Sequence, residues 1–387
     1  MATLQEGDHA KFKETLITEE ALAKYRAKIG TKLRVHNIID EVNRLSLRIV
    51  TNGIGDPNPL WTDPEYAKKT RYGKNPAPPY FFYRVNPGWV QHGLPGVHAF
   101  HSGSDWTILK PALIGDTVTP EITFTGYEEK KSSGFSGRFI MEYQEGKYFN
   151  QRKELLASVK GWLVRAERSA ARDKGKYSGI QLPHPWTEAE LKKVDEDVLA
   201  EQVRGAQVRY WEDVKVGEEL HPVVKGPLGL TDEIAYIAGG LQAHILSLRN
   251  YHEHPSWAFR DPDTYSWEPI GAVHWNKWAA KTAGLPYPYD IGTQRQSWLM
   301  NFLSHWMGDE GWLKKNYAEY RKFVYFSDVV WFRGKVTRKY VDQDGEYVVD
   351  IETHGWNQRS EDTIPGHSTI CLPSKEHKYW PLERRLK

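Results

Sequence analysis

Two segments of this 387-residue chain place acid/base side chains in loops that precede predicted helices. The first is the heptapeptide Gly55-Asp56-Pro57-Asn58-Pro59-Leu60-Trp61, which contains the Asp56 carboxylate. The second contains His274 and lies a short distance ahead of Pro288-Tyr289-Asp290-Ile291-Gly292. Carboxylates and imidazoles can take and give protons at a reacting carbon or oxygen. These residue types therefore predict general acid/base catalysis.

The first loop resembles the GDxNPLH motif of MaoC-like (R)-enoyl-CoA hydratases and dehydratases, a family with the hot-dog fold. The resemblance implies a thioester substrate on which an Asp and a His exchange protons. Asp56 and Asn58 occupy motif positions, whereas Trp61 stands where the family has its His. An indole only donates a hydrogen bond and does not titrate near neutral pH. The first half therefore keeps the loop and lacks one of the two catalytic groups.

Neighbouring segments extend the resemblance over about a hundred residues. Residues 62–70 resemble the family's short helix, and residues 77–79 resemble the start of its central helix. Residues 110–118 resemble the segment that leads into a long strand. Three features in this order favour the family over a chance turn built from Pro and Asx residues.

An internal repeat divides the chain. Placing His274 on Trp61, 213 positions apart, also places Ala280-Lys281 on Ala67-Lys68, and residues 326–330 match residues 114–118 at an offset of 212. Repeated segments at one offset predict two copies of one fold. We expect an N-terminal domain at 1–170, a linker with a helix at 171–205, and a C-terminal domain at 206–387 with an inserted loop at 244–267.

The elements needed to position these loops can be read from periodicity. Residues 292–307, closed by Gly308, predict a central helix in the second half, and residues 78–85 predict a shorter one in the first. Alternating patterns predict strands; they cover residues 119–126, 137–143, 329–338 and 347–353. The predicted class is α+β: a double hot dog, in which two antiparallel sheets each wrap a central helix.

Composition sets further limits. The 52 basic and 50 acidic residues are well mixed and give a net charge of +2, so no surface for nucleic acid is predicted. No apolar run reaches the ~18 residues of a membrane span, and the first residues are polar, so we expect a cytoplasmic protein. The single cysteine, Cys371, excludes an internal disulfide. The many aromatic side chains predict a large core, with a pocket for a bulky acyl group as the alternative.

The resemblance assigns roles to residues in both halves. His274 holds the family's His position, while Pro269 and Gly271 stand where its Asp and Asn would be. We expect His274 to be the principal acid/base, with Asp290 as its carboxylate partner or as a plain helix cap. Backbone N–H groups at Gly292 are predicted to bind the thioester carbonyl. The remaining candidates are Asp56 as a catalytic carboxylate and Asn58, Trp61 and Trp275 as substrate-binding residues.

Other histidines were considered as metal ligands. His244, His252 and His254 fall in the inserted loop, which we interpret as a lid over the acyl site rather than as a metal centre. His92, His98 and His101 lie between the first predicted helix and its strand, where structural hydrogen bonding is expected. No metal site is predicted.

The predicted function is hydration or dehydration of a 2-enoyl-CoA or 3-hydroxyacyl-CoA thioester with a bulky or aromatic acyl group. Two alternatives remain: an acyl-CoA thioesterase that relies on Asp56, and a non-catalytic acyl-CoA-binding subunit of a hydratase complex. No cofactor is expected beyond the CoA of the substrate. The expected partners are a second copy of the chain or another hot-dog protein.

Overall fold

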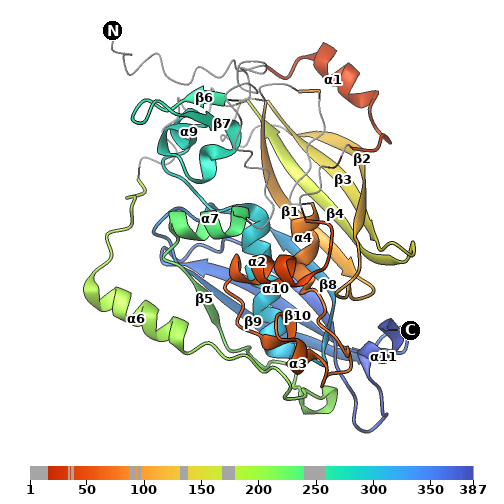
Figure 1. Ribbon diagram of the computed structural model, residues 1–387. Coiled ribbons are helices and arrows are strands. Elements are labelled where there is room, and N and C mark those ends of the chain that lie inside the picture. Colours follow the sequence, from red (N-terminus) through yellow and green to blue (C-terminus); the bar gives the residue numbers. More distant parts are fainter. Residues whose placement is uncertain are drawn as a thin grey trace.

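One antiparallel sheet runs through both halves of the molecule. The structure, a computed structural model, describes residues 16–33, 35, 39–86, 93–94, 97–130, 138–167, 179–238 and 258–386. The sheet has nine strands in the order β2-β3-β4-β1-β8-β11-β10-β9-β5. Figure 1 shows the first-half strands in orange and yellow and most second-half strands in blue. Their bounds are β1 His98–Ile108, β2 Thr119–Lys130, β3 Phe139–Phe149, β4 Leu155–Ala166, β5 Val223–Lys225, β8 Trp312–Glu319, β9 Val330–Val341, β10 Tyr347–Asn357 and β11 Gly366–Cys371.

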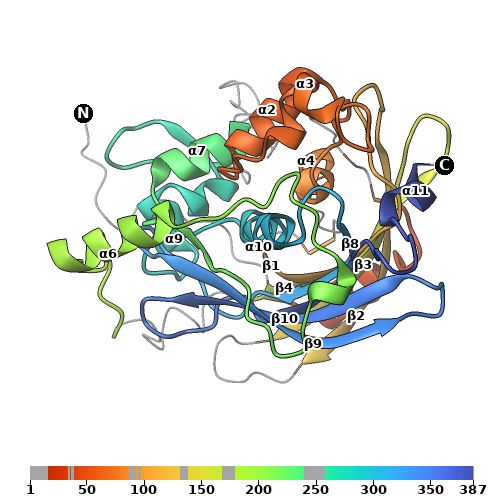
Figure 2. The same ribbon diagram turned by 90° about the horizontal axis from the view of Figure 1, so that it is seen from below.

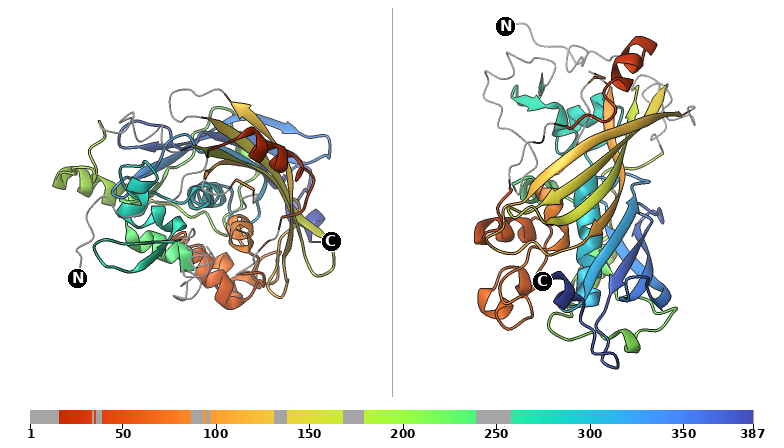
Figure 3. Two further views of the ribbon diagram at one scale, coloured as in Figure 1. Left: turned by 90° about the horizontal axis from the view of Figure 1, so that it is seen from above. Right: turned by 90° about the vertical axis from the view of Figure 1, so that its right-hand side faces the viewer.

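The halves meet where β1 pairs with β8. Gly103 to Thr107 pair with Glu319 to Lys315, so the two half-sheets continue into each other (Figure 3). Gly103 has φ +157, and a Cβ there would lie 2.2 Å from the Trp162 ring and 2.6 Å from the Ala318 carbonyl oxygen. A glycine is therefore required at this position, where a side chain would overlap the Trp162 ring and the backbone of β8.

The predicted central helix of the second half is confirmed. Helix α10 spans Gly292–Met307, and Gly308 ends it with φ 71. All residues from Thr293 to Met307 are buried. Seen along its axis, α10 has the sheet on one side and α2 (Arg44–Asn52), α4 (Phe82–Val85) and α7 (Leu230–Ala238) on the other (Figure 2). The buried residues of α10 include polar ones, and Gln296 and Asn301 find hydrogen-bond partners inside the protein.

The corresponding first-half helix is short. It consists of the 3₁₀ turn η2 (Pro79–Phe81) followed by the single α-helical turn α4. Pro79 stands at the first position of η2, where a missing N–H costs nothing. The element nevertheless packs against α10.

Local structure confirms the repeat around the two acid/base loops. In the first half, η1 (Pro59–Trp61) is followed by α3 (Pro64–Ala67), whose N-cap is Asp63. In the second half, η5 (Ile270–His274) is followed by α9 (Lys277–Thr282), whose N-cap is Asn276. Each cap side chain accepts two backbone N–H groups. The offset of 213 residues therefore aligns structure as well as sequence.

A second repeat joins the ends of strands in each half. The sequence Asn150-Gln151-Arg152-Lys153-Glu154 returns as Asn357-Gln358-Arg359-Ser360-Glu361. In each copy the Asn side chain binds the Glu carboxylate, at 2.7 Å and 3.0 Å. The Arg of each copy pairs with a buried Asp, Asp116 in the first half and Asp328 in the second. The two copies thus share a buried ion pair as well as a turn.

The predicted linker helix is present as α6 (Glu188–Leu199), with Thr187 as its N-cap. Val194 is buried against Val224 and Val329, so α6 packs on the second-half strands β5 and β9. Helices α1 (Glu19–Arg26) and α11 (Pro381–Arg385), the 3₁₀ turn η3 (Trp211–Asp213) and the hairpin β6 (Ala258–Arg260) with β7 (Trp267–Pro269) complete the described elements. Within the described ranges, no helix has the length and apolar character needed to cross a membrane.

Candidate functional site

The Asp56 carboxylate is buried and bound on all sides. Its Oδ1 accepts the backbone N–H of Asn58 at 3.0 Å. Its Oδ2 accepts Trp61 Nε1–H and the Tyr80 hydroxyl, both at 2.8 Å. The Trp61 indole therefore binds the carboxylate that the motif supplies, although it stands at the His position. The first-half loop is held by this carboxylate, and Tyr80 ties it to the start of the short helix.

A histidine from the other half completes this site. His305, in the last turn of α10, lies with Nε2 3.2 Å from Asp56 Oδ1 and with Nδ1 3.1 Å from Glu201 Oε1. Asn301, one helical turn earlier, places its amide nitrogen 2.8 Å from the same Nε2. No sequence motif marks His305, and only the spacing of the polar residues Asn301 and His305, at i and i+4 of a buried helix, could have indicated it.

The charges in this cluster favour an ionised pair. Burial alone would raise the pKa of Asp56, but the contacts with His305 lower it below its usual value overall. Burial would lower the pKa of His305, but the two carboxylates of Asp56 and Glu201 raise it overall. Burial lowers the pKa of Lys225, whose ammonium lies 3.9 Å from Glu201. Charged groups from the first half (Asp56), the linker (Glu201) and the second half (Lys225 and His305) thus interact in one cluster.

A small apolar pocket lies beside Trp61. It has a volume of about 30 Å³, so it holds no more than a few small groups. Carbon-rich side chains from both halves line it: Trp61, Tyr72, Ala77, Pro79, Phe82, Ile108, Lys110, Pro111, Met307, Trp312 and Leu313. The Asn58 side-chain amide is not free to bind a ligand in this pocket, because it already binds Leu60 N–H and Asp309.

The second-half loop places His274 beside the start of α10. His274 Nδ1 lies 2.9 Å from the Tyr289 carbonyl oxygen, and the two rings pack with centroids 4.6 Å apart. A carbonyl oxygen has no hydrogen to donate, so Nδ1 must carry the proton in this hydrogen bond. In the neutral ring, Nε2 then keeps its lone pair. Within the described part of the chain, Nε2 makes no hydrogen bond. Burial lowers the pKa of His274, which keeps the ring neutral at pH 7.

Asp290 has a partner other than His274. Arg295 binds its carboxylate with Nε at 2.7 Å and with a second guanidinium nitrogen. The N-cap is Ile291, and the Asp290 carboxylate accepts no backbone N–H of α10 within the described residues. The predicted Asp290 cap is therefore not formed, and within these ranges no side-chain hydrogen bond joins Asp290 to His274. The carboxylate instead forms a buried ion pair with Arg295, and its charge partly offsets the burial that lowers the pKa of His274. Bidentate guanidinium binding explains this preference, since it satisfies both carboxylate oxygens at once.

Free donors lie at the first turn of α10. In the described ranges, the backbone N–H groups of Gly292 and Thr293 have no acceptor. Gly292 is partly exposed, and a Cβ there would lie 2.7 Å from the Tyr320 ring. The start of a sixteen-residue helix carries a partial positive charge, which favours a bound oxygen with negative character. The predicted oxyanion position is thus adjacent to the loop that holds His274.

The remaining predicted site residues have structural contacts. Trp275 donates Nε1–H to Glu268 at 3.2 Å. His101 Nε2 lies 3.0 Å from Ser104 Oγ, and burial lowers the pKa of His101 to about 4. His98 packs against Phe100. His92, His244, His252 and His254 lie outside the described residues.

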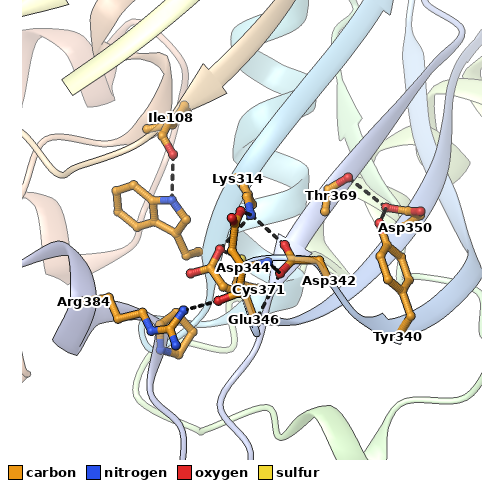
Figure 4. A network of polar contacts seen from close by, with 12 residues as sticks. Ile108, Lys314, Tyr340, Asp342, Asp344, Glu346, Asp350, Thr369, Cys371 and Arg384 are labelled. Carbon is orange, nitrogen blue, oxygen red and sulfur yellow. Dashed lines mark hydrogen bonds and ion pairs between the residues drawn. The ribbon is translucent and has the colours of Figure 1, made fainter. Parts of the chain in front are cut away.

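An acidic cluster in the second half has the spacing of a cation site. Asp342, Asp344 and Glu346 converge, but Lys314 Nζ contacts all three at 2.6, 2.9 and 2.9 Å (Figure 4). Arg385 also pairs with Glu346 at 2.7 Å. Positive side chains already compensate these carboxylates, so the cluster is an ion-pair network that anchors the C-terminal segment.

Comparison with known sequences finds similarity to a dehydratase domain in the first half. Residues 27–159 match the family model described as FAS1-like, dehydratase domain region. A curated relative, a UPF0336 protein from Streptomyces avermitilis, is 35% identical over 86 residues. That match covers 20% of this chain and 57% of the relative, so the chain spans little more than half of that protein.

Comparison with solved structures extends over both halves. A MaoC-like dehydratase has a TM-score of 0.63 at 15% identity, with 90% of this chain and 99% of that one covered. A putative MaoC domain dehydratase from Chloroflexus aurantiacus has a TM-score of 0.54 at 10% identity, covering 90% and 96%. A Mycobacterium tuberculosis protein described as a double hot dog has a TM-score of 0.52 at 11% identity, covering 88% and 96%. Residues 27–159 therefore match the dehydratase domain model, and the chain over most of its length shares the double hot-dog fold of these solved structures.

Proposed function

We propose that this protein hydrates 2-enoyl thioesters, or dehydrates 3-hydroxyacyl thioesters, with His274 as the proton-transferring group. The observation that carries the proposal is the position of His274: its Nδ1 is fixed by the Tyr289 carbonyl, two residues before the helix cap Ile291. An oriented neutral imidazole is suited to general base catalysis near pH 7. The likeness to solved structures described as MaoC-like dehydratases supports this type of reaction.

The thioester carbonyl is proposed to bind at the start of α10. The free N–H groups of Gly292 and Thr293 would donate to its oxygen, which gains negative charge when the neighbouring C2–H bond breaks. Donors fixed in a helix need no reorganisation during the reaction. In this proposal the His274 imidazole transfers the proton, and the backbone N–H groups at the start of α10 stabilise the negative charge on the carbonyl oxygen.

In the dehydration direction, His274 Nε2 takes the proton from C2. The electron pair moves toward the carbonyl oxygen and returns to form the C2–C3 double bond as the 3-hydroxyl leaves with a proton as water. Hydration runs through the same states in reverse. The reaction requires no redox or metal cofactor, so the CoA thioester is the only bound group in the proposal.

The site's surroundings favour a bulky or aromatic acyl group. Tyr289 and Phe323 stack edge to face with centroids 4.7 Å apart, next to the His274 ring. Aromatic walls favour flat or branched acyl chains over short linear ones. We therefore propose cinnamoyl-CoA as a better substrate than crotonyl-CoA.

The thioesterase alternative finds little support in the geometry of Asp56. A carboxylate that activates water needs a free oxygen lone pair facing the substrate. Both Asp56 oxygens are already engaged, by Asn58 N–H, Trp61, Tyr80 and His305. We propose that Asp56 braces the first-half loop. Assembly with a second copy or with another hot-dog protein stays a prediction.

The proposed function is tested by incubating the purified chain with crotonyl-CoA and cinnamoyl-CoA. Loss of enoyl absorbance without release of free CoA supports the proposal. Release of free CoA would favour a thioesterase, and saturable binding with neither change would favour a binding subunit.

A further inference from the structure

A buried carboxyl group in the second half lacks a hydrogen-bond partner among the residues that the structure describes. Glu233, in helix α7, is fully buried, and neither of its side-chain oxygens has a hydrogen bond within these ranges. An unpaired carboxylate away from water is strongly disfavoured, so such a group takes up a proton. In agreement, burial, with the nearby Asp290 and Asp232 carboxylates, raises the pKa of Glu233 well above its usual value.

Glu233 faces the first turn of α10. Its neighbour Asp232 accepts the Gln294 side-chain amide through its carbonyl oxygen, at 3.4 Å. The Tyr236 hydroxyl, one helical turn after Glu233, lies 2.8 Å from Thr293 Oγ1. Residues three apart in a helix lie on one face, so Glu233 and Tyr236 face α10 together. The carboxyl is therefore directed to the region of Asp290 and Thr293, which also borders the His274 loop.

The fold does not require a carboxyl group at this place. Helices α2 and α7 both have nine residues, and each precedes the acid/base loop of its half. Glu233 is the fourth residue of α7, and the fourth residue of α2 is Leu47, which is buried in the core. A leucine fills the matching place in the first half, so a polar group in the second half has a reason other than packing.

We propose that Glu233 is a second catalytic residue, the proton donor to the leaving 3-hydroxyl group, and thereby replaces the carboxyl group that the second-half loop lacks at Pro269. This inference rests on the proposed function. His274 takes the C2 proton, the C2–H pair forms the C2–C3 double bond, and the C3–O bond breaks as the Glu233 carboxyl proton joins the oxygen to give water. His274 ends protonated and Glu233 ionised, and a proton passes back to Glu233 through solvent.

The test compares Glu233→Gln and Glu233→Leu with the wild type on cinnamoyl-CoA. Gln keeps the shape without a transferable proton, and Leu installs the first-half residue. General acid help is worth ~10²- to 10⁴-fold, so both variants should lose at least about 100-fold in kcat. KM should change little in both variants, and the melting temperature of Glu233→Leu should hold or rise because an unpaired polar group is removed. The rate of the wild type should fall at high pH, and this fall should be absent from the pH profile of Glu233→Gln.

Wild-type kcat and an unchanged pH profile in Glu233→Gln would overturn the inference. A second readout does not depend on turnover: the infrared band of a protonated carboxyl, assigned by its loss in Glu233→Gln. A non-hydratable CoA thioether should shift this band if Glu233 lies at the ligand. If the wild type turns over neither substrate, the proposed function fails. In that case an unshifted band would also overturn the placement of Glu233, and a shifted band would support it.

Discussion

Asp56 and His305 are 249 residues apart in the sequence, yet Asp56 Oδ1 and His305 Nε2 lie 3.2 Å apart in the core. The contact joins the motif loop of the first half to the last turn of the second-half helix. Trp61 binds the other oxygen of Asp56. The first-half motif thus forms a contact between the two copies, and the proposed mechanism assigns the acid/base role to His274.

The Asp56–His305 pair should give stability over a limited pH range. The pKa of Asp56 is lowered from 3.8, so its contribution is present above about pH 3.8 and is lost as the pH falls through the folded-state pKa. The pKa of His305 is raised from 6.5, so its contribution is present below about pH 6.5 and is lost as the pH rises through the folded-state pKa. Urea unfolding of wild type and His305→Gln from pH 3 to 9 should show the largest difference between about pH 4 and 6.5. A pH-independent difference would contradict the ion pair.

Trp61 should matter for stability rather than for turnover. Trp61→Phe removes one of two hydrogen bonds to Asp56 Oδ2, and a hydrogen bond to a charged group contributes ~1.5–3 kcal/mol. Denaturant unfolding should show a loss of this size, while kcat on an enoyl-CoA stays within about threefold. A large fall in kcat at full folding would place the chemistry in the first half.

The N–H donor at Gly292 can be removed with a matched control. Gly292→Pro deletes the donor at a first helical position, where proline is well tolerated. Gly292→Ala keeps the N–H but adds the same Cβ beside the Tyr320 ring. Loss of one oxyanion donor typically costs ~10²- to 10³-fold in rate. We expect kcat to fall by that amount in Gly292→Pro relative to Gly292→Ala, and equal kcat values would rule out this donor.

Much of the architecture followed from the sequence. The bounds of α10 were set by Gly292 and Gly308, and the offset between Trp61 and His274 aligned two 3₁₀ turns and two capped helices. The clearest repeat, at 150–154 and 357–361, is also present in the sequence. Its structural role follows only from the structure, in which the Arg side chain of each copy binds a buried Asp.

The site was harder to predict because its partners come from distant segments. Asp290 was matched with His274 by proximity in sequence, whereas Arg295 at i+5 offers a bidentate guanidinium. His305 and Glu233 carry no motif. His305 became visible through its distance to Asp56, and Glu233 through burial without a partner. Such relationships depend on packing between helices, which a local pattern does not encode.

The central claim is that His274, not Asp56, transfers the proton. The most direct test is kcat of His274→Ala and of Asp56→Ala on the same enoyl-CoA, each corrected for its folded fraction. General acid/base catalysis is worth ~10²- to 10⁴-fold, so His274→Ala should lose at least about 100-fold while Asp56→Ala keeps most of its turnover. If Asp56→Ala abolished turnover and His274→Ala spared it, the active site would lie in the first half and this account would be wrong.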